Sequence, residues 1–243
     1  SSVFSNNTAK LAAGVIYARD ADMGISTCQF ANNTATRDGG ALYCAGNCNW
    51  AVKNSQFDSN KCGANGGAVF GWNLIASISS STLLGNAAGA LGGAVSVANS
   101  TLDMSSCMVG SNSATGSDAA GGGVYSQSST LNLTDSTFSS NTATWGGAVY
   151  VTNGTLALAG GSITNSSVTG SGAGVYALRT PTSLVDVKFE YNDAAKYAGS
   201  LYCHASSCSV SSCNVNYDSA SLGAGSFWVG YGSIAIRSSH IHG

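Results

Sequence analysis

The chain contains few charged residues and almost no proline. Only 8% of its 243 residues are charged, against roughly 25% in an ordinary globular protein. Nine scattered Lys and Arg and a net charge of −2 exclude the basic stripe that binds nucleic acid. No apolar run approaches the roughly 20 residues of a membrane-spanning helix, and no secretory signal opens the chain. The 44% hydrophobic content is unlike that of a disordered chain.

A two-part phrase returns about every 26 residues. Its first half is a bulky apolar residue followed by an asparagine-rich turn. These apolar positions are Phe4, Phe30, Phe57, Leu84, Val109, Phe138, Ile163, Phe189, Val215 and Ile241. Its second half is a strand resembling Gly-Gly-Ala-Val-Tyr, with its glycine position at Gly14, Gly40, Gly67, Gly93, Gly122, Gly147, Ala173, Gly199 and Gly225. Such a fixed period predicts a solenoid in which each coil buries its apolar side against its neighbours.

The stretch 129–150 shows how one coil is expected to form. Residues 130–138 alternate apolar and polar side chains with the period of a strand. Asn141 then marks a turn, because asparagine tolerates left-handed backbone angles, and 146–150 forms a second strand. The turn column contains Asn7, Asn33, Asn60, Asn112, Asn141, Asn192 and Asp218. Its side chains are predicted to hydrogen-bond from coil to coil.

Eight cysteines, an even number, favour an oxidising compartment. Cys44 follows a Gly-Gly-Ala-Leu-Tyr strand and stands four residues before Cys48. Cys203 holds the same place in its own repeat, five residues before Cys208. Each pair is predicted to form a small local disulfide.

The remaining cysteines are Cys28, Cys107, Cys213 and Cys62. The first three stand two residues before an apolar anchor and are interpreted as buried thiols of one column. Cys28 and Cys107 lie three coils apart, about 14 Å, which is too far for a disulfide. Cys62 has no assigned place in the repeat. The three histidines share no ligand-like spacing with the cysteines, so no metal and no cofactor is predicted.

Six Asn-x-Ser/Thr sequons are candidate N-glycosylation sites. They stand at Asn6, Asn32, Asn99, Asn132, Asn153 and Asn165. Several fall in predicted turns, where a glycan can be accommodated. Together with the cysteines, they favour an extracellular or cell-surface location.

The densest group of ionisable residues gives little support for catalysis. Asp186, Lys188 and Glu190 alternate along one strand, and His240 falls in the Lys188 column two coils later. Polysaccharide-cleaving enzymes need clustered carboxylates, or a carboxylate-bound cation beside a base, whereas most acids of this chain are isolated. We interpret the group as a solvated, charge-compensated face and predict no catalytic residue.

An aromatic column accompanies the glycine-rich strand. It consists of Tyr17, Tyr43, Phe70, Tyr125, Tyr150, Tyr176, Tyr202 and Trp228. Outward rings would form a ladder on which sugars stack, whereas rings stacked on one another would only stabilise the strands. Ser96 interrupts the column, which favours the outward orientation. A minor alternative is an ice-binding threonine array at Thr8, Thr34 and Thr142, which Lys61 breaks.

Two stretches combine both halves of the phrase most clearly. They are Phe30-Ala31-Asn32-Asn33 with 39–43, and Phe138-Ser139-Ser140-Asn141 with 146–150. These paired motifs resemble the polymorphic outer membrane protein (Pmp) repeat, and the resemblance covers nearly the whole chain. It implies a right-handed parallel β-helix of the pectin-lyase-like superfamily, in a surface-exposed or secreted protein used for adhesion or as a spacer. The low charge, cysteine loops and sequons fit a eukaryotic member better than a bacterial autotransporter passenger.

We therefore expect an all-β, right-handed parallel β-helix of nine to ten coils, forming one domain over 1–243. Because the chain opens and closes inside a repeat, it is expected to be a segment of a longer extracellular protein. The predicted function is a non-enzymatic structural or adhesive module of a cell surface, cell wall or filament. The alternative is a carbohydrate-binding or carbohydrate-active protein that uses the aromatic column. The expected partners are further segments or copies of the same protein, placed end to end, and surface glycans.

Overall fold

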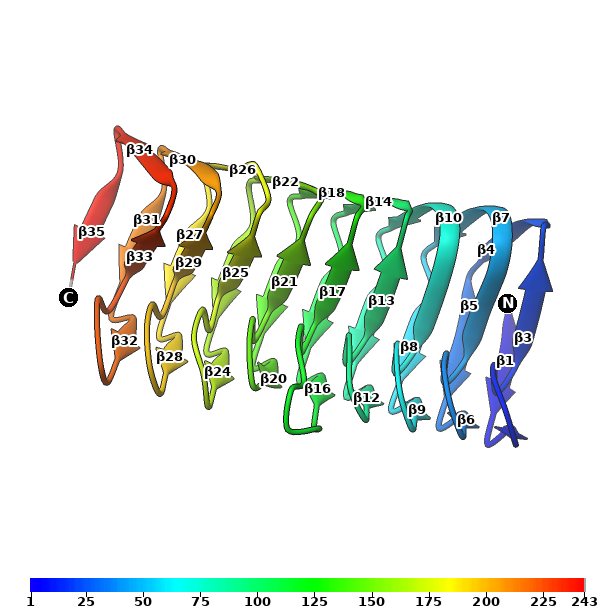
Figure 1. Cartoon of the computed structure of the whole chain (residues 1–243). Helices are drawn as coiled ribbons and strands as arrows, with labels where there is room; N and C mark the ends of the chain where they lie inside the picture. Colours follow the sequence, from blue (N-terminus) through cyan, green and yellow to red (C-terminus); the bar gives the residue numbers. More distant parts are fainter. Residues whose placement is uncertain (243) are drawn as a thin grey trace.

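The computed structural model describes residues 1–242, which form strands and turns and no helix. Figure 1 shows a rod of stacked coils with the two termini at opposite ends. The chain is a parallel β-solenoid of about nine turns with about 26 residues per turn. The all-β class, the parallel coils and the period predicted from the sequence are confirmed.

Each coil contributes strands to three parallel sheets. Sheet A has ten strands and carries the bulky apolar residues. Its strands are β1 (Ser2–Ser5), β5 (Cys28–Ala31), β8 (Gln56–Asp58), β11 (Thr82–Leu84), β15 (Met108–Gly110), β19 (Thr137–Ser139), β23 (Ser162–Thr164), β27 (Lys188–Glu190), β31 (Asn214–Asn216) and β35 (His240–His242).

Sheet B has nine strands of two residues each, which follow the asparagine turn. They are β2 (Thr8–Ala9), β6 (Thr34–Ala35), β9 (Lys61–Cys62), β12 (Ala87–Ala88), β16 (Ser113–Ala114), β20 (Thr142–Ala143), β24 (Ser167–Val168), β28 (Asp193–Ala194) and β32 (Ser219–Ala220).

Sheet C has 16 strands in two rows that meet at a corner. The row before the corner contains β3 (Ile16–Arg19), β13 (Val95–Ala98), β17 (Val124–Gln127), β21 (Val149–Thr152), β25 (Val175–Leu178), β29 (Leu201–His204) and β33 (Phe227–Gly230). The row after it contains β4 (Asp22–Ser26), β14 (Thr101–Ser105), β18 (Thr130–Thr134), β22 (Thr155–Ala159), β26 (Thr182–Val185), β30 (Ser207–Ser211) and β34 (Ser233–Arg237). Two strands continue through the corner, β7 (Leu42–Lys53) and β10 (Val69–Ser79).

The apolar anchors fill the rod along sheet A. Phe30, Phe57 and Phe138 are at most 1% exposed, and the rings of Phe30 and Phe57 stack with centroids 4.8 Å apart. The register pairs Phe57 with Leu83, so the expected anchor Leu84 is wrong. Leu84 is 37% exposed, whereas Leu83 is fully buried.

The asparagine turn explains this correction. Phe57 precedes a buried asparagine, Asn60, by three residues, and Leu83 precedes Asn86 by the same spacing. Leu83 and Leu84 are adjacent and chemically identical, but only Leu83 stands three residues before the asparagine, Asn86. Asn86, which is 0% exposed, therefore belongs to the predicted asparagine column as an additional member.

The asparagine ladder is formed by Asn7, Asn33, Asn60, Asn86, Asn112 and Asn141, and by Asn192 with Asp218; Asn7, in the first coil, is exposed and the other members are buried. Along it, each Nδ2 except that of Asn141 donates to the Oδ1 of the next coil at 2.8–3.0 Å. From Asn33 onward, each Nδ2 also donates to the carbonyl oxygen of the preceding coil's anchor region. Ser166 interrupts the ladder between Asn141 and Asn192. The predicted coil-to-coil bonding is confirmed, because the buried carboxamides satisfy one another.

Close approach of the coils requires glycine at the start of the second strand. A Cβ on Gly67 would collide with the carbonyl oxygen of Gly93 and with the backbone of Ala87. A Cβ at this position crowds the neighbouring coil, which explains why glycine recurs there; the 173 position, where the column has Ala173, is an exception.

Two disulfides cross-link the corner of sheet C from inside the rod. Cys44 and Cys48 are joined with their Cα atoms 6.3 Å apart, and Cys203 and Cys208 with theirs 6.7 Å apart. All four residues are at most 4% exposed. Each disulfide ties a strand before the corner to the chain after it and so fixes the bend.

The remaining cysteines are free thiols within residues 1–242. Cys107 and Cys213 are buried in the predicted column, while Cys28 is only partly buried. Cys62 lies in β9 and packs with Ala35 and Ala88 of the adjacent coils. Burial raises the pKa of the Cys62 thiol to about 12, so it stays protonated and unreactive at neutral pH.

Candidate functional site

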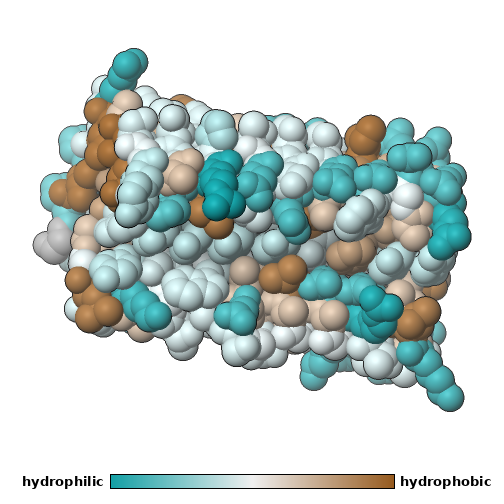
Figure 2. All heavy atoms as spheres, in the orientation of Figure 1, coloured by the Kyte–Doolittle hydropathy of each residue, from teal (hydrophilic) through white to brown (hydrophobic). Residues whose placement is uncertain are grey.

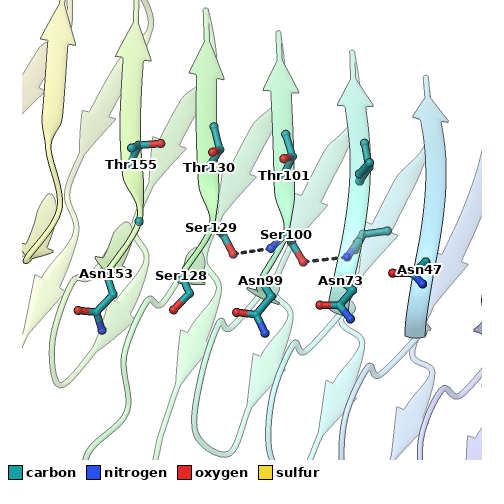
Figure 3. Close-up of a pocket in the computed structure, with 13 residues that line it drawn as sticks. Asn47, Asn73, Asn99, Ser100, Thr101, Ser128, Ser129, Thr130, Asn153 and Thr155 are labelled. Atoms are coloured by element: carbon teal, nitrogen blue, oxygen red, sulfur yellow. Dashed lines mark hydrogen bonds between the residues drawn. The ribbon is translucent and has the colours of Figure 1, made fainter.

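A polar groove of about 680 Å³ follows the corner of sheet C across five coils (Figure 3). One side carries Asn47, Asn73, Asn99, Ser128 and Asn153, and the other carries Thr101, Thr130 and Thr155. The residues that line the groove include no titratable side chain. The groove therefore offers hydrogen bonds at the coil spacing of about 4.8 Å without acid–base chemistry.

The backbone conformation explains why asparagine recurs at the corner. Asn73, Asn99 and Asn153 have φ values of 52°, 50° and 54°, and Ser128 has 50°. Asparagine tolerates this left-handed region better than most residues. Figure 3 shows their side chains directed away from the strands. Within residues 1–242 the carboxamides of Asn73, Asn99 and Asn153 make no hydrogen bond, so they are free to bind a ligand or carry a modification.

Beneath this row, serine hydroxyls close the backbone of the corner. The Ser100 Oγ accepts a hydrogen bond from the Leu74 N–H at 2.9 Å and donates to the Ala98 carbonyl at 2.7 Å. The Ser129 Oγ accepts in the same way from the Ser100 N–H at 2.9 Å. The Ser100 and Ser129 hydroxyls are thus occupied by hydrogen bonds to the backbone. Only the side chains of the outer row, Asn73, Asn99, Ser128 and Asn153, are available to contact a ligand.

The six sequons fall into two structural classes. Asn6, Asn32, Asn99, Asn153 and Asn165 lie in left-handed turns and are exposed. Asn132 instead lies in β18, partly buried, and its Nδ2 donates to Asp103 Oδ1 at 2.7 Å. Asn99 and Asn153 both line the polar groove, so glycans on them would fill it.

The aromatic column forms two stacked runs, broken at Ser96. Neighbouring rings have centroids 5.1 Å apart in the first run and 4.2–5.4 Å apart in the second. Val149 and Val151 are buried, while Tyr150 between them is only partly buried. The rings of the column therefore lie on the face of the strands that points away from the core. Solvent reaches most of the column: Tyr17 is 49% exposed and the other rings are partly exposed, whereas Tyr125 is 8% exposed and Ser96 only 2%. The outward orientation of the rings therefore rests on this alternation and not on Ser96, which is itself buried.

Stacking limits what the aromatic column can bind. The ring faces inside each run are covered by the neighbouring rings, and the edge of Trp145 packs against Tyr176 at 5.9 Å. Burial raises the pKa of Tyr125 to about 12. Sugar binding by the column stays a prediction, and the geometry shows a stabilising role for the rings.

The ionisable group of sheet A is charge-compensated as expected. Lys188 Nζ lies 2.8 Å from Glu190 Oε2, with the two side chains 48% and 23% exposed. Asp186 occupies a left-handed turn before them. The register links Lys188 to Asn214 and Asn214 to His240, which places His240 in the predicted column. An exposed pair of this kind contributes at most about 1 kcal/mol.

Residues 1–242 contain no cluster of three or more His, Cys, Asp or Glu residues placed to hold a metal ion. The same residues contain no helix long and apolar enough to cross a membrane.

The structure contains a second cleft that the sequence did not predict. It lies over the first three coils and is lined by Arg19, Arg37, Asp38 and Trp72, among others. The large or charged side chains of Arg19 and Trp72 could have indicated this cleft in the sequence, because the same strand column has alanine in other coils, at Ala45 and Ala98. A solenoid column needs no such residues for stacking.

Two segments of the chain match the model of a known repeat family. Residues 27–45 and 135–152 match the family model of the Chlamydia polymorphic membrane protein repeat. These two segments contain the two clearest copies of the paired motif, and they occupy equivalent places in their coils. Neither the curated proteins nor the solved structures contain a match to this chain. The chain thus carries repeats of the Pmp type on a β-solenoid.

Proposed function

We propose that this chain is a surface-exposed β-helix module with a structural or adhesive role. The observation that supports it most is the coincidence of two Pmp-type repeat matches with a regular solenoid. The proteins after which that repeat is named are membrane proteins of Chlamydia. A rod of this kind displays side chains at fixed spacing along its length, which suits a spacer or an adhesive surface.

The surface of the rod supports the same function. Most of the face visible in Figure 2 is weakly polar, with small teal and brown areas distributed over it. Five exposed sequon asparagines in turns and two buried disulfides are compatible with an oxidising, extracellular setting. The right-handed, pectin-lyase-like assignment is part of this proposal.

End-to-end stacking is the partner interaction that we include in the proposal. Apolar residues gather at the left end of Figure 2, where the C-terminal coil lies. Ile241 of β35 is 44% exposed, and Val3 of β1 at the opposite end is 65% exposed. Both belong to strands that have a neighbour on one side only. A further coil, from the same chain or from a second copy, would satisfy these edges.

Surface labelling of the native cells tests the location. An antibody against the purified chain should label intact cells, and brief protease treatment of those cells should remove the label. Labelling only after permeabilisation would contradict the proposal.

Adhesion is tested separately with beads coated with the purified chain. Beads carrying the folded chain should attach to cells, and beads carrying heat-unfolded chain should not. Equal attachment of both bead types would show that the rod is not an adhesive surface.

A further inference from the structure

A cleft of about 600 Å³ over the first three coils combines charge with exposed aromatic surface. One part of its lining, Arg19, Tyr43 and Trp72, comes from the strands of sheet C before the corner. The other part, including Arg37 and Asp38, comes from the turns that precede those strands. The fold thus brings residues from three coils to one place.

The strand column under this cleft alternates between large and small residues. The register aligns Arg19 with Ala45, Ala45 with Trp72, and Trp72 with Ala98. Ala45 therefore leaves a gap between Arg19 and Trp72, which are two coil spacings, about 10 Å, apart. Arg19, Ala45 and Trp72 all line the cleft, so the space above Ala45 is part of it.

Trp72 is the tryptophan most suited to contact a ligand. Its side chain is 49% exposed, whereas Trp50 is 1% exposed. Trp145 and Trp228 pack against tyrosines, but within residues 1–242 Trp72 has no aromatic or cationic partner. A half-exposed indole of this kind costs hydrophobic free energy in water and is available for stacking.

The charges of the cleft leave the donors of Arg37 free, whereas Arg19 Nη2 donates a hydrogen bond to the Tyr17 hydroxyl at 3.3 Å. The chain has only nine Lys and Arg, and two of them, Arg19 and Arg37, line this cleft. Asp38 is 6% exposed, and its Oδ1 accepts two hydrogen bonds from Asn65, at 3.1 and 2.9 Å. Its Oδ2 lies 3.9 Å from Arg37 Nη2, and the Arg37 side chain is 67% exposed. Asp38 thus lies beside the Arg37 guanidinium, whose N–H groups remain free to donate hydrogen bonds to a ligand.

The base of the cleft is fixed by the fold. Asp20 Oδ1 accepts a hydrogen bond from the Asn47 N–H at 2.9 Å. Gly46 lies so close to the Asp20 carboxylate that a Cβ there would collide with it. The buried Cys44–Cys48 disulfide holds the same corner. A site built on cross-linked strands is preorganised, which lowers the entropy cost of binding.

We propose that this cleft binds an acidic sugar, that is, a pyranose ring carrying a carboxylate. The apolar face of the ring stacks on Trp72, its carboxylate pairs with the Arg37 guanidinium, and a hydroxyl donates to Asp38 Oδ2. The parallel N–H donors of a guanidinium match the two oxygens of a carboxylate. A groove lined by aromatic side chains and a few polar groups is typical of small-ligand sites. The inference rests on the proposed adhesive function for its biological use and names the surface glycan that the rod would contact.

Calorimetric titration of the purified chain with an oligosaccharide of uronic acids tests the site. Its carboxyl-reduced, neutral counterpart serves as the matched ligand. We expect saturable binding of the acidic form only, and binding that weakens as salt is added. Trp72→Ala and Arg37→Gln should each weaken binding by about tenfold or more. Tyr231→Ala and Arg179→Gln, which change an exposed tyrosine and an exposed arginine elsewhere, should bind like the unmodified chain.

Several results would overturn the assignment. They are absence of binding, equal binding of the neutral oligosaccharide, and Trp72→Ala or Arg37→Gln variants that keep full affinity while their circular dichroism shows a native fold. The bead assay separates this failure from that of the proposed function. If calorimetry shows no acidic-sugar binding and Trp72→Ala leaves bead attachment unchanged, the site is removed and the adhesive rod is retained. Acidic-sugar binding without cell attachment would retain the site and remove the adhesive role.

Discussion

Truncation of a single buried asparagine should destabilise the rod strongly. Asn112 is 0% exposed, and its side chain makes four hydrogen bonds. Its Oδ1 accepts from the backbone N–H of Asn86 at 2.9 Å and from Asn86 Nδ2 at 3.0 Å. Its Nδ2 donates to Leu83 O at 2.9 Å and to Asn141 Oδ1 at 3.0 Å. The Asn112→Ala substitution removes all four.

The magnitude follows from what these partners lose. A buried hydrogen bond contributes about 1 kcal/mol net, and a buried donor left without an acceptor costs about 1–3 kcal/mol. Two donors of Asn86 lose their acceptor, so we expect a loss of about 4 kcal/mol. That is a large part of the roughly 5–15 kcal/mol by which domains are stable.

Urea unfolding followed by far-ultraviolet circular dichroism measures this loss. Asn49→Ala is the matched control, because Asn49 is an exposed strand residue whose side chain makes no hydrogen bond within residues 1–242. Its substitution should change the free energy of unfolding by no more than about 0.5 kcal/mol. If Asn112→Ala and Asn49→Ala cost the same, the ladder does not stabilise the fold and the reasoning fails.

Three further predictions concern the anchor, a buried acid and a disulfide. Leu83→Ala should cost about 2–5 kcal/mol and Leu84→Ala under about 1 kcal/mol in the same urea assay; the reverse order would restore Leu84 as the anchor. Burial raises the pKa of Asp218, so the native state holds this proton more tightly than the unfolded chain. Stability should therefore be lost as pH rises from about 4 through that raised pKa. Asp218→Asn should remove this part of the pH dependence between about pH 3 and pH 8, and an unaltered pH profile would contradict it. Replacing Cys44 and Cys48 together by Ala should cost about 2 kcal/mol, given the short loop that they close; an unchanged urea midpoint would show that the corner does not need the cross-link.

Part of the candidate surface was predictable and part was not. The sequons, the paired cysteines and the aromatic column could be named from the sequence because each recurs at a fixed place in the repeat. Their surroundings could not. Asn132 satisfies the same sequon rule as Asn153, but Asn132 bonds Asp103 while Asn153 is exposed in a turn. Only the register between coils distinguishes them.

The architecture could be predicted from the sequence, because a phrase repeated every turn imposes the same strands, the same turn and the same buried column on each coil. Which of Leu83 and Leu84 faces the core became clear only from the register between coils, since either of two adjacent leucines could fill the apolar position. The tertiary structure also decided that the aromatic rings cover one another's faces. The acidic-sugar cleft arises only when coils stack, because Arg19, Arg37 and Trp72 are far apart along the chain and meet through the coil register. Local pattern specifies a repeating unit, whereas contacts between units depend on how successive copies are aligned.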